Sequence, residues 1–211
     1  MRRKREKGLT LIELLTVVAI VAILAAILIP YSFNRLEDSR IARMEEEISS
    51  IRSAIFLFFN DNATIPTIWQ DLVIRPTGFN NWRGPYINKA PNTTTATWNQ
   101  GTPWKTNLVL YRLVGAAADN RFAATTNLYP FRNAFAIEIA NPVVGGSPTI
   151  PLSSLQKIDQ DIDNGAPGSG FMIEANPAIS PFITTTNMAG LNTGANYAGA
   201  GRSAYILIFT Y

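Results

Sequence analysis

Few side chains in this chain are suited to chemistry. Its 211 residues include no histidine and no cysteine, so the commonest general base, the commonest zinc ligand and any disulfide are absent. The serines lack a G-x-S-x-G context, and the segment 165–170, GAPGSG, follows an expected helix without opening a new one. The sequence therefore predicts a protein that is not an enzyme, and two sets of carboxylates remain as candidate functional groups.

Glu13 is the first candidate, because it is the only charged residue in the 21-residue run 9–29, LTLIELLTVVAIVAILAAILI. At about 1.5 Å per residue, a helix of this length spans about 31 Å, close to the hydrocarbon core of a bilayer. A carboxylate at the centre of such a helix costs about 2.5–3.5 kcal/mol, and less near its end. We therefore expect Glu13 to have a charged partner; the alternative is a protonated Glu13 with no role in lipid.

The second candidate is the acidic segment KIDQDIDNG, with Asp159, Asp161 and Asp163. Its alternating carboxylates are similar to those of a calcium-binding loop. However, the glycine comes one residue late, and the twelfth loop position is Gly170 rather than glutamate. Asp159 and Asp163 are also four residues apart, which on a helix places them on one solvated face. Both interpretations, a solvated helix end and a calcium site, remain open at this point.

The residues before the apolar run are strongly basic. The first eight positions hold five of the 18 Lys and Arg residues and one of the 15 acidic residues. The chain after Gly8 therefore has 13 basic and 14 acidic residues, a net charge of −1. The basic leader is thus a topology signal for a cytoplasmic N-terminus, and the nearly neutral remainder disfavours nucleic acid as a partner. The apolar run exceeds the 7–15 residues of a secretory signal peptide, so we expect a membrane anchor with an exported C-terminal part.

The helical pattern continues beyond Pro30, a residue that removes one backbone hydrogen bond and kinks a helix. After position 34, apolar residues recur at spacings of three and four and form one stripe: Ile41, Met44, Ile48, Ile51, Ile55 and Phe58. Stop signals follow at 60–66. One helix of about 75 Å over 9–59 is therefore expected, with this stripe packed on a sheet.

The rest of the sequence predicts a β-rich domain. Many prolines and glycines indicate an ordered loop region at 60–105, anchored by Trp82, Tyr86 and Trp104. Strands are expected at 108–114, 134–139, 171–175 and 203–211, the last of them central and buried, with a short helix starting near Pro151 and ending at Asn164-Gly165. The segment 176–202, rich in Asn, Thr, Gly and Ala, is expected to be an exposed excursion.

Three segments carry a resemblance to a known family, and a fourth carries a faint one. The segment 7–30, KGLTLIELLTVVAIVAILAAILIP, resembles the class III leader of type IV prepilins and type II secretion pseudopilins: a short basic leader ending in glycine, then [FML]-T-L-I-E and an apolar helix. NNWRGPYINKAP at 80–91 resembles a W-x-G-P-Y-[LI]-x-K-x-P segment of major pseudopilins. KIDQDIDNG is similar to a recurring C-terminal segment of pilin-like proteins. GTPWKTNLVLYR at 101–112 is only faintly similar to their D-P-W-G segment, since Thr102 and Lys105 depart from it.

The resemblance implies roles for particular residues. Prepilin peptidase, a membrane aspartic peptidase, would cleave between Gly8 and Leu9 and N-methylate Leu9, where the family usually has phenylalanine. Glu13 would pair with the Leu9 amine of a neighbouring subunit during assembly, and Pro30 would mark a bend in the helix. Some major pseudopilins bind calcium in C-terminal loops; no other cofactor is implied.

The expected fold class is α+β and pilin-like, with a long N-terminal helix, half transmembrane and half amphipathic, packed on a C-terminal antiparallel β-sheet. The expected divisions are a prepilin leader at 1–8, a transmembrane and assembly helix at 9–30, and the amphipathic helix with the exported domain at 31–211.

The expected function is that of a structural subunit of a type II secretion pseudopilus; the alternative is a major or minor subunit of a type IV or competence (DNA-uptake) pilus. Expected partners are further copies and other pilin-like subunits, prepilin peptidase, the inner-membrane assembly platform and, before assembly, membrane lipid. The expected location is the bacterial inner membrane, spanned once, and then a periplasmic or cell-surface filament.

Overall fold

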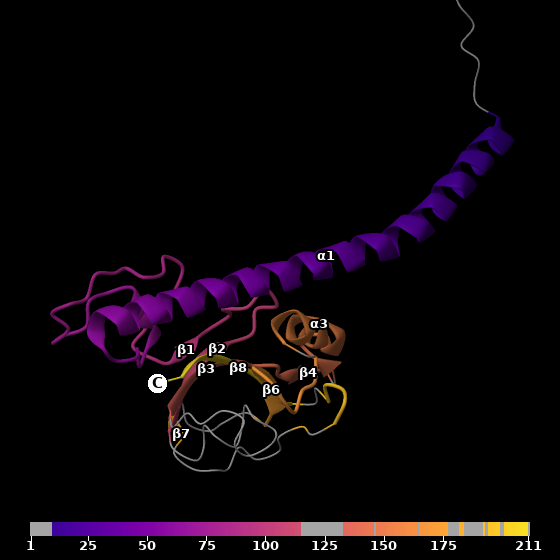
Figure 1. Cartoon of the computed structure of the whole chain (residues 1–211). Helices are drawn as coiled ribbons and strands as arrows, with labels where there is room; N and C mark the ends of the chain where they lie inside the picture. The colour runs from indigo at the N-terminus through magenta and orange to yellow at the C-terminus, as the bar shows by residue number, and fades with distance from the viewer. Residues whose placement is uncertain are drawn as a thin grey trace, which may run out of the picture. The chain divides into compact units, whose positions relative to one another are not determined.

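The computed structural model describes residues 10–114, 133–145, 147–163, 165–176, 182–183, 192, 194–198 and 201–210. The chain forms two compact units, Met1–Ser39 and Arg40–Tyr211. Helix α1 (Leu11–Asn62) contributes to both, and every strand belongs to the second unit (Figure 1). Residues Gly8 and Leu9, and most of the expected excursion at 176–202, lie outside the described residues.

Helix α1 is continuous through Pro30, which confirms the prediction of one long helix. All six residues of the predicted apolar stripe, from Ile41 to Phe58, are buried, and Ala54 is buried with them. The helix stops where Ala63 adopts a left-handed conformation, with φ of 52°, and donates its N–H to the carbonyl of Phe59 at 2.7 Å. The second half of α1 is therefore the helical layer of the globular unit.

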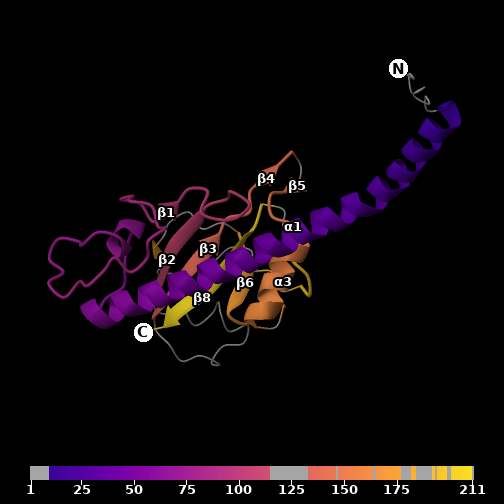
Figure 2. The same cartoon turned by 90° about the horizontal axis from the view of Figure 1, so that it is seen from above.

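Within the described residues the sheet has six strands: β1 (Thr97–Trp98), β2 (Leu108–Val114), β3 (Asn133–Ile139), β6 (Met172–Ala175), β7 (Phe182–Ile183) and β8 (Ser203–Thr210). Their order is β1-β2-β3-β8-β6, all antiparallel, and β7 pairs with β2 in parallel (Figure 2). The four predicted strands are confirmed, and β8 lies between β3 and β6 as expected for a central strand. The two-residue strands β1 and β7 were not predicted.

One face of the sheet forms the core with α1 and with helix α3 (Leu152–Ile162), which lie on the same side of it in Figure 1. The fully buried core side chains include Trp69, Phe58, Phe135, Met44, Ile51, Ile55, Leu72, Leu108 and Leu110. Alternate strand residues point to the other face. There Tyr111 of β2 and Tyr205 of β8 are also buried, with their rings edge-to-face at 5.7 Å.

The predicted loop region contains the short 3-10 helix η1 (Trp69–Leu72). The carboxylate of Asp71 accepts hydrogen bonds from the N–H groups of Thr67 and Ile68 just before this helix. Trp82 donates its indole N–H to the carbonyl of Asp71 at 2.9 Å and packs edge-to-face on Tyr86. Trp104 is buried. These contacts confirm the aromatic side chains as anchors of the loop.

A small hairpin precedes α3 and was not predicted. Its strands are β4 (Val143–Val144) and β5 (Ser147–Pro148), and Gly145 in the connecting turn has φ of +62°. Helix α3 follows with Pro151 at its N-terminal cap, which confirms the predicted short helix. Leu155 and Ile158 bury its apolar side in the core.

Candidate functional site

The first part of α1 is an uncovered apolar surface. An 18-residue window of this helix has a mean hydropathy of 3.0, and none of it is buried. Among the described residues, α1 is the one helix whose length and composition suit a membrane span. Exposed large apolar side chains run from Leu11, 79% exposed, to Leu36. Such a surface is far larger than a single soluble chain leaves in water, so lipid or other protein must cover it.

Glu13 forms a reciprocal cap with Thr10 at the start of this surface. Glu13 Oε2 accepts hydrogen bonds from the Thr10 amide at 2.8 Å and from the Thr10 hydroxyl at 2.7 Å. The Thr10 Oγ1 in turn accepts the Glu13 amide N–H at 3.3 Å, and the Thr10 carbonyl accepts the Leu14 N–H. This is a capping box, with Thr10 as N-cap and Glu13 three residues later. The helix N-terminus thus binds the carboxylate, and its macrodipole favours the negative charge there.

The sequence interpretation singled out Glu13 but missed Thr10. The signal was present, because T-x-x-E before an apolar run is the sequence pattern of a capping box. The carboxylate therefore has a partner inside its own chain, while its second oxygen, Oε1, has no hydrogen-bond donor in the part of the chain that the structure describes.

Other polar side chains in the apolar part of α1 also bond to the helix itself. The hydroxyl of Thr16 donates to the carbonyl of Ile12 at 2.8 Å, and the hydroxyl of Ser32 donates to the carbonyl of Leu28 at 3.0 Å. These bonds leave few polar groups to solvate in an apolar environment. Ser32 lies next to the turn that Pro30 occupies, where one backbone donor is missing.

The three aspartates around α3 separate into different environments. Asp159 is fully buried, and its Oδ2 accepts the hydroxyl of Tyr197 at 2.9 Å. Burial, and then a hydrogen bond with the Asp163 carboxyl, raise the pKa of Asp159 to about 7. Asp163 Oδ2 accepts the amide N–H groups of Phe171 and Met172, the latter at 3.0 Å. Asp159 and Asp163 therefore form a pair that ties α3 to β6.

Asp161 is exposed and belongs to a different contact. Its carboxyl group hydrogen-bonds to that of Glu45 on α1; burial and then this bond raise the pKa of Glu45. Within the described residues, no group of three or more His, Cys, Asp or Glu side chains is placed to hold a metal ion. The expected set thus divides into a buried Asp159, a half-buried Asp163 beside it, and an exposed Asp161 with a different contact.

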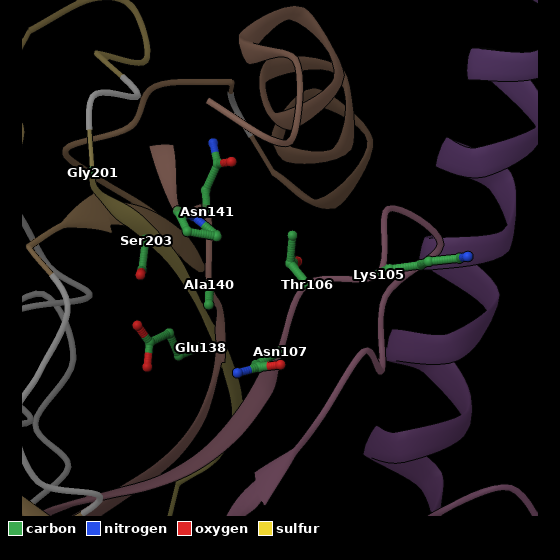
Figure 3. A pocket seen from close by; sticks show the side chains of 9 residues that line it. Lys105, Thr106, Asn107, Glu138, Ala140, Asn141, Gly201 and Ser203 are labelled. Atoms are coloured by element: carbon green, nitrogen blue, oxygen red, sulfur yellow. The ribbon is translucent and has the colours of Figure 1, made fainter. Parts of the chain in front are cut away.

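A pocket of about 240 Å³ opens beside the end of β3 (Figure 3). Glu138, almost fully buried, and Ser203 lie together on one side of it, while the Lys105 side chain points away toward α1. Burial raises the pKa of Glu138, and hydrogen bonds with Ser203, Tyr111 and Tyr205 lower it in part. These hydroxyl groups hold the Glu138 side chain on the sheet.

The amide of Asn141, another wall of this pocket, is also used within the fold. Its Oδ1 accepts the Ile150 N–H at 2.7 Å, and its Nδ2 donates to the Ile150 carbonyl at 3.2 Å. This pair of bonds fixes the chain on either side of the β4–β5 hairpin. The side chains of Asn141 and Glu138, which line the pocket, therefore make hydrogen bonds within the fold.

Comparison with known proteins identifies the family of this chain. Residues 3–29 match the family model of the prokaryotic N-terminal methylation motif. The chain is 34% identical over 98 residues to the type II secretion system core protein G of Pseudomonas aeruginosa, covering 43% of this chain and 69% of that protein. The corresponding protein of Aeromonas hydrophila is 30% identical over 98 residues, 68% of its length.

A shorter stretch matches pilins. The chain is 50% identical over 50 residues to the type IV major fimbrial protein FimA of Dichelobacter nodosus, covering 24% of this chain and 32% of that protein. No solved structure matches. The chain belongs to the type IV pilin-like family, which includes core protein G of type II secretion systems. The proteins it resembles are structural subunits, and its leader motif and apolar helix fit a pilin that is first held in the inner membrane.

Proposed function

We propose that this chain is a structural, non-catalytic subunit of a type II secretion pseudopilus. The observation that carries the proposal is the uncovered apolar part of α1 with a capped Glu13 at its start, in a chain that resembles core protein G over two thirds of that protein. Helices with this surface assemble by packing against one another, and the sheet domains then face outward.

The proposed processing step is cleavage between Gly8 and Leu9 by prepilin peptidase, followed by N-methylation of Leu9. Cleavage leaves a positive amine at Leu9, directly before the Thr10–Glu13 cap. An unpaired charge in a medium of low dielectric constant is costly, and pairing two opposite charges relieves both penalties. Glu13 Oε1, which is free of the cap, is the atom offered to the Leu9 amine of a neighbouring subunit.

The cap gives this pairing a definite geometry. Because Thr10 fixes one carboxylate oxygen against the helix end, the other oxygen has a defined direction and the neighbour's amine has one position to occupy. Helices then assemble only in the register in which the charges meet. Pro30 belongs to the same surface, and we propose that the helix loosens or bends there in the filament.

Before assembly, the subunit spans the inner membrane once, with the basic leader in the cytoplasm and the sheet domain exported. Its partners are prepilin peptidase, the inner-membrane assembly platform, and then further copies and other pilin-like subunits in the filament. No nucleic acid is proposed, because the chain beyond the leader has a net charge of −1.

A type IV pilus or competence pilin is the second candidate, and the 50% identity to a major fimbrial protein over 50 residues favours it. One experiment separates the two. Deleting the gene for this chain should abolish export of secretion substrates while surface pili persist; loss of surface pili or DNA uptake with normal secretion would support the second candidate. In both cases, the chain should be recovered from purified filaments, and its absence from all filaments would contradict the proposal.

A calcium ion remains a proposal for the C-terminal carboxylates, and the position of Asp161 weighs against a three-carboxylate site. The Asp159–Asp163 pair alone could accept one cation, since the half-buried carboxyl of Asp163 meets the buried carboxyl of Asp159. Isothermal titration of residues 34–211 with calcium is the test. Heat of binding that Asp159→Asn removes would support the site, and no heat at millimolar calcium would contradict it.

A further inference from the structure

The globular unit exposes few large apolar side chains, and two of them are neighbours. Phe56 and Leu57, near the C-terminal end of α1, are 54% and 50% exposed. The other large apolar side chains exposed in this unit, among the described residues, are not adjacent in sequence: Ile74, Val144 and Phe171. Single exposed apolar residues are ordinary on protein surfaces, but an adjacent pair beside a hollow indicates a contact surface.

The pair borders a groove of about 420 Å³ between α1 and the end of β8. The residues that line it are Arg52, Ser53, Phe56, Leu57 and Ile208. Arg52 donates from Nη2 to the Leu207 carbonyl at 3.3 Å, so part of its hydrogen-bonding capacity is used within the fold. Among the residues that the structure describes, no acidic side chain lines the groove, and its chemistry suits an uncharged, apolar occupant.

The β4–β5 hairpin carries an exposed apolar side chain and no charge, which complements the apolar groove. Val144 is 69% exposed, the largest exposed fraction of any large apolar side chain described in the globular unit. It stands directly before the turn at Gly145. The sequence from 139 to 156, IANPVVGGSPTIPLSSLQ, carries no charge, so burying this tip against another protein requires no charge to lose its water.

The hairpin and the groove lie toward opposite ends of the same unit. Figures 1 and 2 both show β4 at one end of the sheet domain and the C-terminal end of α1 at the other. One copy therefore cannot fill its own groove with its own hairpin. A projection at one end and a hollow at the other produce a head-to-tail contact, which repeats into an open helical filament when the rotation between copies does not close a ring.

We infer that the Val144 tip of one copy occupies the Phe56–Leu57 groove of the next copy in the filament. This inference rests on the proposed function and adds a contact between the globular units to the one made by the N-terminal helices. The occupant is a second copy of this chain, because the chain itself offers a matching uncharged projection at the end opposite its groove.

Disulfide cross-linking tests the contact directly, because the chain has no native cysteine. The full chain carrying Leu57→Cys and Val144→Cys together would be assembled into filaments in its own cells, and the filaments oxidised. A head-to-tail contact joins each copy to the next, so a denaturing, non-reducing gel should show a ladder of multimers. Either substitution alone should give monomers, as should the control pair Leu57→Cys with Ile74→Cys.

The outcomes separate this inference from the proposed function. Filaments of the double variant without a ladder would overturn the inference and leave the proposed function standing. Dimers from Leu57→Cys alone would show groove facing groove and would also overturn it. If the unmodified chain forms no filaments, the proposed function fails and the inference fails with it.

A charge at the tip provides a second measurement. Val144→Glu should lower the yield of filaments by about tenfold or more, because a carboxylate would lose its water in an apolar groove. Val144→Thr, of nearly the same shape, should lower the yield much less. Thermal unfolding of both variants should match the unmodified chain, because this side chain is largely exposed; equal filament yields would contradict the inference.

Discussion

The carboxylate of Glu13 accepts hydrogen bonds from both the amide and the hydroxyl of Thr10, at 2.8 and 2.7 Å. The one charge in the apolar part of α1 is therefore bound at the helix end of its own chain before any second subunit arrives. This lowers the penalty of holding a carboxylate in lipid, and it leaves one oxygen for an intermolecular partner.

Removing the Thr10 hydroxyl should weaken assembly. Thr10→Val keeps the shape of the side chain but removes both hydroxyl bonds to Glu13, whereas Thr10→Ser keeps them. A helix cap is worth about 1 kcal/mol, so we expect filament yield to fall by roughly fivefold in Thr10→Val and to stay near normal in Thr10→Ser. Counting filaments by immunogold labelling checks this. Equal yields from the two variants would show that the cap has no role.

The amphipathic second half of helix α1 could be predicted from residue types and their spacing alone. The stripe from Ile41 to Phe58 repeats at helical spacing because the helix has one core-facing side, and the structure buries every member of it. The strand at 108–114 was predicted at its actual bounds because it is long and bounded by turn residues. Elements of two residues, such as β1 and β7, carry too little pattern to be predicted.

The separation of the aspartates could not be predicted from spacing. Helical periodicity brings Asp159 and Asp163 to one face, but it does not say that this face meets Tyr197 from a distant part of the chain. Nor does it say that Asp161 meets Glu45 on α1. Both contacts join residues far apart in sequence, and only the folded chain shows them.

The Asp159–Asp163 pair should make stability depend on pH. The pKa of Asp159 is raised from 3.8 to about 7 in the folded chain, so folding favours its protonated form. This stabilisation is complete below about pH 4 and is lost as the pH rises through about 7. Urea unfolding of residues 34–211 should therefore give a falling free energy of unfolding across this range.

The matched variant for this prediction is Asp159→Asn, which keeps the shape of the side chain and cannot titrate. The fall between pH 4 and pH 7 should be smaller in this variant by up to about 1.4 kcal/mol per pH unit, the limit for one proton. An identical pH profile in both proteins would contradict the assignment of the proton to the pair.

Gly170 should tolerate a methyl group less well than Gly78. Both glycines have a left-handed backbone, with φ of +92° and +89°, so alanine strains either one by about 1–3 kcal/mol. A Cβ at Gly78 meets nothing within 4 Å, whereas one at Gly170 collides with the Asp163 carboxylate. That carboxylate is held by the amides of Phe171 and Met172 and cannot move away freely.

We therefore expect Gly170→Ala to reduce the free energy of unfolding by about 1–3 kcal/mol more than Gly78→Ala does. Urea denaturation of both variants of residues 34–211 measures the difference. If Gly78→Ala is as destabilising as Gly170→Ala, the steric explanation is wrong and only the backbone conformation matters.

Processing should depend on the residue before the proposed cut. Gly8→Asp should leave a precursor that keeps its basic leader and stays in the membrane fraction, because a bulky, charged residue replaces glycine at the cleaved bond. Intact mass measurement should find residues 1–8 still attached in this variant. The unmodified chain should begin with N-methylated Leu9, and any other N-terminus would contradict the proposed cleavage site.

The central claim is that Glu13 guides assembly and is not needed for cleavage, and Glu13→Ala tests it most directly. The yield of sheared filaments and the mass of the N-terminus should be measured in the same cells. We predict that cleavage after Gly8 persists at its normal level while incorporation into filaments is lost. Normal filaments built from Glu13→Ala subunits would contradict the account.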